Sequence, residues 1–121
     1  MSYDVQLYRT ETMIREQQTK DENFFDHETN LEPFTDLQKE ELHDRLLAYN
    51  YKMVKQEQGN SWYRHDDGLA ISVMLTGRGL YFQTASGGDS IFEIGMTASE
   101  FTDTGEFAKY DPQSGGWEEI E

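Results

Sequence analysis

The sequence contains no cysteine, only two prolines, and no apolar run long enough to cross a membrane as a helix. Without cysteine the chain forms neither disulfides nor zinc sites built on thiolates, and its composition suits a reducing compartment. The chain begins MSYDVQLYRTE, which has neither the basic segment nor the apolar stretch of a secretory signal peptide. We therefore expect a cytoplasmic protein.

Basic residues are also scarce, because 10 Lys and Arg stand against 24 Asp and Glu, which gives a formal net charge of −14. The acids are spread over both halves of the chain, so the charge belongs to the whole protein and not to an appended tail. Nucleic acid is an unfavourable ligand, since a phosphate backbone needs cationic contacts. A basic partner protein is favoured, although the same charge would also serve solubility alone. Both explanations stay open.

Length and aromatic content indicate one globular domain. The 121 residues suit a single domain, residues 1–121, and are too few for two ordinary ones. Seven Tyr, seven Phe and two Trp can supply much of the core area.

The N-terminal part predicts one strand and a polar segment. Residues 2–9, SYDVQLYR, alternate apolar and polar side chains, which is typical of a strand. Residues 10–34 are predicted to form an acidic surface loop, with a turn or two of helix near 11–18. Phe24 and Phe25 are expected to hold this loop against the domain.

The clearest helix is predicted over about 36–49. Thr35 followed by Gln38 matches a capping box, in which the two side chains satisfy amides at the helix start. The apolar residues that follow at helical spacing should lie against a sheet; they are Leu42, Leu46, Leu47 and Tyr49.

From residue 51 the pattern changes to short alternating segments separated by glycine-containing turns. It predicts an antiparallel meander over 51–96, with strands at 51–56, 61–65, 69–75, 80–85 and 90–96. Phe101, Gly105 and Ala108 then recur at near-helical spacing, which predicts a second, shorter C-terminal helix. The expected fold class is α+β, with helices packed on a mostly antiparallel sheet.

The C-terminal segment 110–121 is predicted to be part of the fold. Asp111 precedes Pro112 and is biased towards extended backbone, which favours a short edge strand near 110–113. Trp117 follows a glycine-rich turn and is expected to fold back onto the domain.

The two ends of the chain, SYDVQLY and YDPQSG, resemble those of small uncharacterised bacterial proteins that begin with a SYD strand and end with an extended DPQ segment. The resemblance covers roughly a tenth of the chain. Some of these proteins are similar in size and acidity to immunity proteins, which neutralise toxins. The resemblance carries no assigned activity to this chain, and it raises toxin binding as one hypothesis.

The histidines do not form a motif of known chemistry. His65 stands beside Asp66 and Asp67, which could orient it, but a hairpin turn explains the DDG sequence equally and is favoured. His43 lacks the second histidine of the zinc-hydrolase motif, and His27 lies in a stretch that does not match a calcium-binding loop. We expect no cofactor and no metal, and the sequence favours a binding protein over an enzyme.

Aromatic residues suggest the surface to examine first. Trp62, Tyr63, Tyr81, Phe82 and Phe92 fall on neighbouring predicted hairpins, where adjacent residues point to opposite faces. The candidate partner-binding residues are Trp62, Tyr63, His65, Asp66, Asp67, Tyr81 and Trp117. Ordinary packing, with Phe24 and Phe25 filling that face, is the alternative.

The sequence therefore predicts a non-enzymatic, acidic domain that binds a basic partner, in one form a toxin-neutralising protein. One alternative is a small-ligand or enzymatic domain with a pocket near His65. The other is a homodimer or larger assembly, formed by edge pairing of the strand at 90–96 or of the tail strand.

Overall fold

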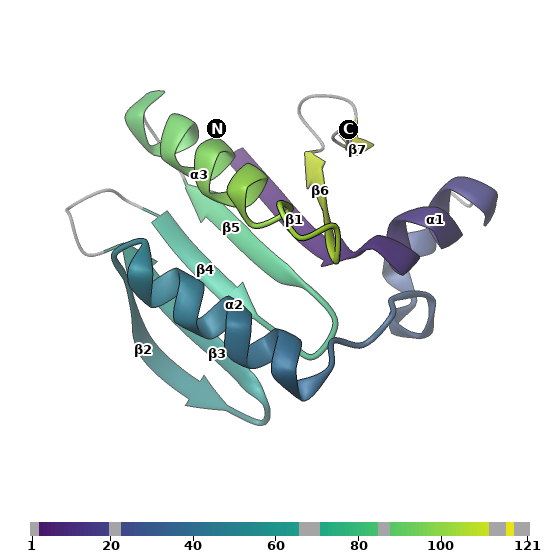
Figure 1. Ribbon diagram of the computed structural model, residues 1–121, viewed down its shortest axis with the longest axis horizontal. Helices are drawn as coiled ribbons and strands as arrows, with labels where there is room; N and C mark the ends of the chain where they lie inside the picture. The colour runs from purple at the N-terminus through teal and green to yellow at the C-terminus, as the bar shows by residue number, and fades with distance from the viewer. Residues whose placement is uncertain (1–2, 20–22, 66–70, 85–87, 112–115, 118–121) are drawn as a thin grey trace.

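The computed structural model describes residues 3–19, 23–65, 71–84, 88–111 and 116–117 (Figure 1). Its elements are β1 (Tyr3–Arg9), α1 (Thr10–Thr19), η1 (Phe24–Asp26), η2 (Glu28–Asn30), α2 (Asp36–Ala48), β2 (Tyr51–Glu57), β3 (Asn60–His65), β4 (Ile71–Leu75), β5 (Leu80–Thr84), α3 (Gly88–Glu100), β6 (Phe107–Asp111) and β7 (Gly116–Trp117).

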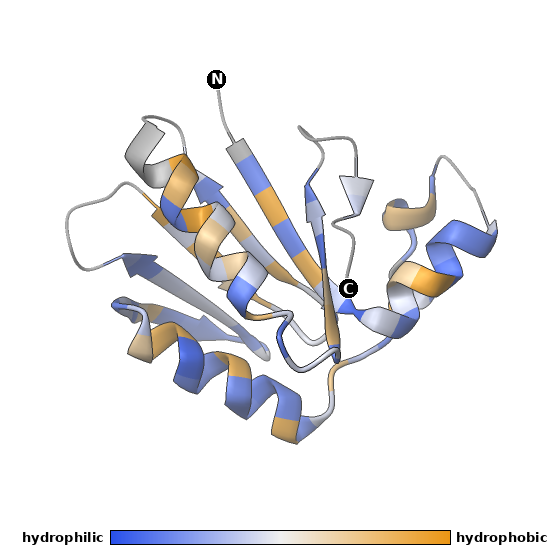
Figure 2. Cartoon of the chain, turned by 45° about the horizontal axis from the view of Figure 1, so that its top comes forward, coloured by the Kyte–Doolittle hydropathy of each residue, from blue (hydrophilic) through white to orange (hydrophobic). Residues whose placement is uncertain are grey.

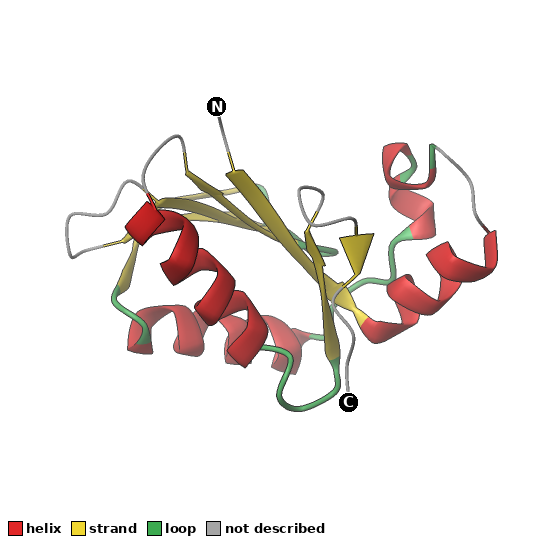
Figure 3. Ribbon diagram, turned by 90° about the horizontal axis from the view of Figure 1, so that it is seen from above, coloured by secondary structure: helices red, strands yellow, loops and turns green. Residues whose placement is uncertain are grey.

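The strands form one antiparallel sheet in the order β2-β3-β4-β5-β1-β6-β7. Helices α2 and α3 cover one face, and α1 lies at the end of the sheet that carries β1, β6 and β7 (Figures 1 and 3). The predicted α+β class with a mostly antiparallel sheet is confirmed.

The main core lies between the sheet and the pair α2 and α3. Strand alternation directs one set of side chains towards the helices, and the helical period supplies the facing residues. The largest fully buried members of this core are Leu7, Leu42, Leu46, Tyr63, Ile71, Leu80, Phe82, Ile94, Phe101 and Phe107. The strand predicted at 2–9 is confirmed over its described residues 3–9, with Val5 and Leu7 inside.

The predicted cap of α2 is confirmed. The Thr35 hydroxyl accepts a hydrogen bond from the Gln38 amide at 3.0 Å, and the Gln38 side-chain oxygen accepts one from the Thr35 amide at 2.9 Å. Leu42 and Leu46 are buried as expected. Leu47 is not, because one residue beyond Leu46 the helix has turned by about 100°, and its side chain is 47% exposed.

Replacement of the cap tests how much this start stabilises the domain. Thr35→Ala is expected to lower the free energy of unfolding by about 1 kcal/mol, because the Gln38 amide loses its acceptor. Thr29→Ala, at an exposed threonine outside the cap, is the matched control and should change little. Urea denaturation measures both; equal midpoints for the two variants would contradict the cap's contribution.

The hairpin between β2 and β3 follows from its turn residues. Gln58 and Gly59 both have positive φ angles, 53° and 84°, as a two-residue turn of the type I′ kind requires. A bulge interrupts the pairing between Met53 and Lys55. The strands predicted at 51–56 and 61–65 are confirmed, and the strand predicted at 80–85 is confirmed over its described residues 80–84. The predicted turn at 66–68 and the first two residues of the strand at 69–75 lie outside the described residues.

The strand predicted at 90–96 is wrong, because these residues belong to α3. Ile94, Ala98 and Phe101 recur at i, i+4 and i+7, and all three are fully buried on one side of the helix and its C-terminal turn. Phe92, expected on a hairpin, lies on the outer side of α3 and is 68% exposed. A short apolar run carries no periodicity that separates a strand from a helix.

The prediction of a shorter C-terminal helix over Phe101, Gly105 and Ala108 is also wrong. Helix α3 ends at Glu100, a turn follows in which Gly105 has a φ of 79°, and β6 begins at Phe107. Phe107 and Lys109 point towards the helix layer, where the Lys109 ammonium donates to Ser99 Oγ at 3.1 Å. The expected strand near 110–113 is confirmed for Tyr110 and Asp111, whereas Pro112 lies outside the described residues.

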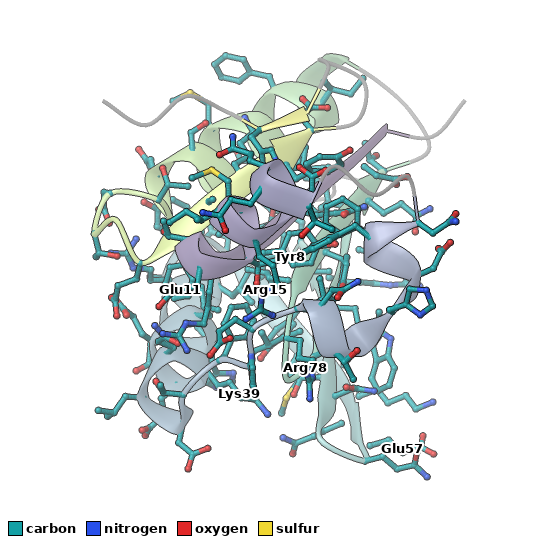
Figure 4. The ribbon with its side chains drawn as sticks, turned by 90° about the vertical axis from the view of Figure 1, so that its right-hand side faces the viewer. Tyr8, Glu11, Arg15, Lys39, Glu57 and Arg78 are labelled. Carbon is teal, nitrogen blue, oxygen red and sulfur yellow. The ribbon has the colours of Figure 1, made fainter. Side chains whose placement is uncertain are left out.

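The segment 10–34 is more ordered than the predicted loop. Helix α1 takes up ten residues and two short 3₁₀ helices follow it. Buried Thr12 accepts a hydrogen bond from the Glu32 amide at 2.8 Å. Arg15 donates to the Asn30 carbonyl at 2.8 Å and to Glu32 at 3.1 Å, which ties α1 to the segment after η2 (Figure 4). These long-range contacts are not visible in a local pattern.

Candidate functional site

The candidate residues chosen from the sequence do not share one surface. Tyr63 and His65 lie on the face of the sheet that α2 and α3 cover, whereas Trp62 and Tyr81 lie on the opposite face. Trp117 lies on β7, at the far end of the sheet from β2. Asp66 and Asp67 lie outside the described residues.

Tyr63 is a core residue with one polar contact. Its ring is buried, and its hydroxyl lies 2.7 Å from Nδ1 of His43 on α2. Burial raises the pKa of the Tyr63 hydroxyl, so it stays neutral at physiological pH. His65 contacts the edge of the Tyr51 ring at 4.9 Å between centroids. Tyr63 thus packs in the core, and His65 is partly exposed beside Tyr51.

On the sheet face opposite α2 and α3, the aromatic residues near β1, β6 and β7 pack against one another, as the alternative of ordinary packing expected. There Phe25 stacks on Tyr8 with ring centroids 5.2 Å apart and lies 4.8 Å from Tyr110. Trp117 contacts Tyr110 at 4.9 Å, and its indole nitrogen donates to Glu16 of α1 at 2.9 Å. As expected, Trp117 folds back onto the domain. Phe24 and Phe25 therefore occupy the space between sheet and acidic segment that a pocket would need.

An acidic stripe on the outer side of α2 was not predicted from the sequence. Leu37, Glu41, Asp44 and Ala48 recur at i, i+4, i+7 and i+11. Together with Glu40 and Arg45 they border a shallow hollow of about 460 Å³. Leu37 is 77% exposed in the described structure. Figure 2 shows hydrophobic and hydrophilic residues alternating along this helix. The sequence does contain an indication of this surface. Leu37 is five residues before Leu42, so at about 100° per residue it lies on a different side of the helix from Leu42 and Leu46.

A groove runs beside this stripe, between α2 and the β2–β3 hairpin. It holds about 400 Å³ and is lined by Asp36, Lys39, Glu40, His43, Met53, Gln56, Gly59, Ser61, Tyr63 and Leu75. The Lys39 ammonium reaches the Gly59 carbonyl at 3.4 Å, which links the helix to the hairpin at the end of the molecule where Glu57 also lies (Figure 4). The groove thus combines apolar walls with two carboxylates and the Lys39 ammonium from α2.

The carboxylates of this face exceed the cations that could neutralise them. Arg45 lies 3.6 Å from Glu41 and 2.9 Å from Asp103, and its guanidinium stands 5.6 Å from the centre of the Phe101 ring. Among the described ion pairs, Asp36, Glu40 and Asp44 have no basic partner. The acidic face, as we name Asp36, Leu37, Glu40, Glu41, Asp44 and Leu47, is therefore able to take up added positive charge.

Two further observations concern the described part of the chain. It holds no group of three or more histidine, aspartate or glutamate side chains arranged to bind a metal ion. None of its helices has the length and apolar character needed to span a bilayer. Compared with protein-family models, with curated proteins and with solved structures, the chain matches none of them.

Proposed function

We propose that this protein is a non-enzymatic binding domain whose acidic face engages a basic partner protein. The observation that carries the proposal is the stripe on α2, where exposed Leu37 is followed by Glu40, Glu41 and Asp44. An exposed leucine near Glu40 and Asp44, which have no basic partner among the described ion pairs, is the composition that an amphipathic basic segment would complement.

The stripe and the groove suggest how such a segment would bind. Its apolar side chains would cover Leu37 and Leu47, while lysine or arginine heads would pair with Glu40 and Asp44. The groove beside α2 would accept one long basic side chain, its stem against Met53 and Leu75 and its head near Asp36. No proton transfer or bond breaking is required of any residue in this arrangement.

The net charge of −14 supports the same proposal at longer range. It would steer a basic partner towards the protein and make association fast at low salt. A toxin-neutralising role is the specific form of this proposal that the resemblance at the chain ends favours. A toxin gene directly beside the gene for this chain would support it, and co-purification of the two products would test it.

The experiment uses a short peptide of alternating lysine and leucine as a defined basic probe. The double variant Glu40→Gln, Asp44→Asn should weaken binding about tenfold at low salt, because two exposed carboxylates at the contact are lost. The matched control Glu57→Gln, Asp26→Asn removes the same two charges from other exposed positions and should retain most of the affinity. Fluorescence anisotropy of the labelled peptide measures all three proteins.

Salt separates the electrostatic contribution from the apolar one. Affinity of the unmodified protein should fall several-fold between low and physiological salt, since exposed charges are screened over about 8 to 10 Å. Equal weakening by both double variants would show that only net charge matters and would overturn the acidic face as the site. A salt-independent affinity would contradict the electrostatic part of the proposal.

The alternative of a homodimer rested on edge pairing of either of two strands, and one of them is absent. Residues 90–96 are helical and offer no strand edge. The tail strand β7 does lie at one end of the sheet, as that expectation required.

A further inference from the structure

The sheet has one side chain from every strand in a single row on the face opposite α2. Cross-strand register places Lys55 beside Trp62, Trp62 beside Met74 and Met74 beside Tyr81. The row continues through Gln6, Tyr110 and Trp117. Neighbours in such a row stand about 4.5 to 5.5 Å apart at Cβ, so they form one continuous surface.

Only one half of this row is covered. The aromatic cluster of Tyr8, Phe24 and Phe25, with α1, packs over the Tyr110 and Trp117 end. Over β2, β3 and β4 no described helix lies on this side of the sheet (Figure 3). We name the uncovered side chains Lys52, Val54, Lys55, Trp62, Arg64 and Met74 the open sheet face.

The open sheet face has the opposite charge from the rest of the molecule. Lys52, Lys55 and Arg64 are all exposed, and Lys52 pairs with Arg64 in the row next to that of Trp62. Among the described residues of β2 to β5 on this side, Glu57 is the one carboxylate, and it lies 3.1 Å from Lys55. In a chain with a net charge of −14, a cluster of three cations on two adjacent strands is not what random placement would favour.

A hollow of about 360 Å³ opens in this face. It is lined by Val54, Lys55, Trp62, Tyr63, Arg64, Ser72 and Val73. The Lys55 ammonium stands 5.1 Å from the centre of the Trp62 ring, and Val54 is largely exposed. Apolar walls between cationic heads form a site for an apolar side chain that has acidic neighbours.

Protection of the sheet edge explains only part of this composition. Lysines and a bulge are common on terminal strands, where they prevent pairing with other chains, and β2 is a terminal strand with both features. Trp62 and Arg64, however, lie on β3, which is paired on both sides. An interior strand needs no such protection, so a half-exposed tryptophan beside an exposed arginine calls for another reason.

We propose that the open sheet face binds an acidic peptide segment of a second partner, with an apolar side chain in the hollow and carboxylates on Lys52, Lys55 and Arg64. The site is independent of the acidic face, which lies on the opposite side of the sheet and prefers the opposite charge. A peptide is favoured over nucleic acid because the cations lie on only two adjacent strands, about 5 Å apart, and within about 10 Å along β2. A longer polyanion would run from them onto the acidic remainder of the molecule.

The test uses the full chain labelled with ¹⁵N and a short peptide of alternating glutamate and valine. Backbone resonances of β2 and β3 should shift on titration, and a peptide with glutamine in place of glutamate should bind at least about tenfold more weakly. Arg64→Glu should weaken binding of the acidic peptide by about tenfold or more. The double variant Gln17→Glu, Gln18→Glu, at exposed positions of α1, changes the net charge equally and is the matched control.

Each other outcome overturns the proposal. Equal binding of the two peptides would show that the hollow selects only apolar side chains. Tighter binding of oligothymidylate than of the acidic peptide would assign the face to single-stranded nucleic acid. Self-association that Arg64→Glu abolishes would assign it to a second copy of the chain. Absence of shifts at millimolar peptide, with the thermal midpoint of Arg64→Glu unchanged, would show that the face has no acidic peptide ligand.

Discussion

Removal of residues 110–121 is expected to lower the free energy of unfolding by about 3 to 5 kcal/mol, because the rings of Tyr110 and Trp117 no longer pack against the aromatic cluster of Tyr8, Phe24 and Phe25. Tyr110 and Trp117 pack against Phe25 and each other, and Trp117 also contacts Tyr8 at 6.0 Å. The truncation further exposes the edge of β1 next to the shortened β6. We expect the thermal midpoint to fall by about 10 °C or more.

Two matched variants locate the source of this effect. Removal of residues 118–121 alone keeps Trp117 and should leave the midpoint close to that of the full chain. Trp117→Phe keeps a ring but loses the indole donor to Glu16. Its thermal midpoint should therefore lie between that of the full chain and that of the protein without residues 110–121. Calorimetry of all four proteins provides the comparison. An unchanged midpoint after removal of 110–121 would show that the tail is a peptide motif and not part of the fold.

Phe101→Ala is expected to cost about 3 to 5 kcal/mol, the range for a fully buried phenylalanine. The ring joins three elements, since it contacts Tyr49 at 5.4 Å, Phe82 at 6.3 Å and the Arg45 guanidinium at 5.6 Å. The remaining cavity would lie where α2, α3 and the sheet meet, so the surrounding side chains have little freedom to fill it.

Phe92→Ala is the natural control, because it removes the same side chain from the exposed side of α3. It should change the free energy of unfolding by about 0.5 kcal/mol or less. Urea denaturation of both variants therefore tests the placement of α3 directly. Similar losses for the two would contradict a helix that buries Phe101 and exposes Phe92.

The elements that sequence patterns predicted well have signals within a few residues of one another. The cap of α2 needs only Thr35 and Gln38, and the β2–β3 turn needs only Gln58 and Gly59. Alternation also predicted that one of Trp62 and Tyr63 would be buried and the other not. It did not predict which, because local alternation is identical for both faces of a strand.

The errors fall where the deciding contacts are distant in sequence. Residues 90–96 become helical because the helix formed with Ala98 and Phe101 buries one side against the sheet and Tyr49. Residues 107–111 become a strand because β1, about a hundred residues earlier, offers an unpaired edge. Neither the number nor the spacing of apolar residues in a short segment shows which distant part of the chain it will contact.

By itself the sequence determined the net charge, the α+β class, the cap of α2, the β2–β3 turn and the number of aromatic residues, since each depends on composition or on neighbouring residues. Only the tertiary structure decided how charge is distributed in space. Helix rotation gathers Glu40, Glu41 and Asp44 beside Leu37 on the outer side of α2, and strand register gathers Lys52, Lys55 and Arg64 around Trp62 on the opposite side. A partner responds to local potential within a Debye length, and that potential depends on packing that no local pattern specifies.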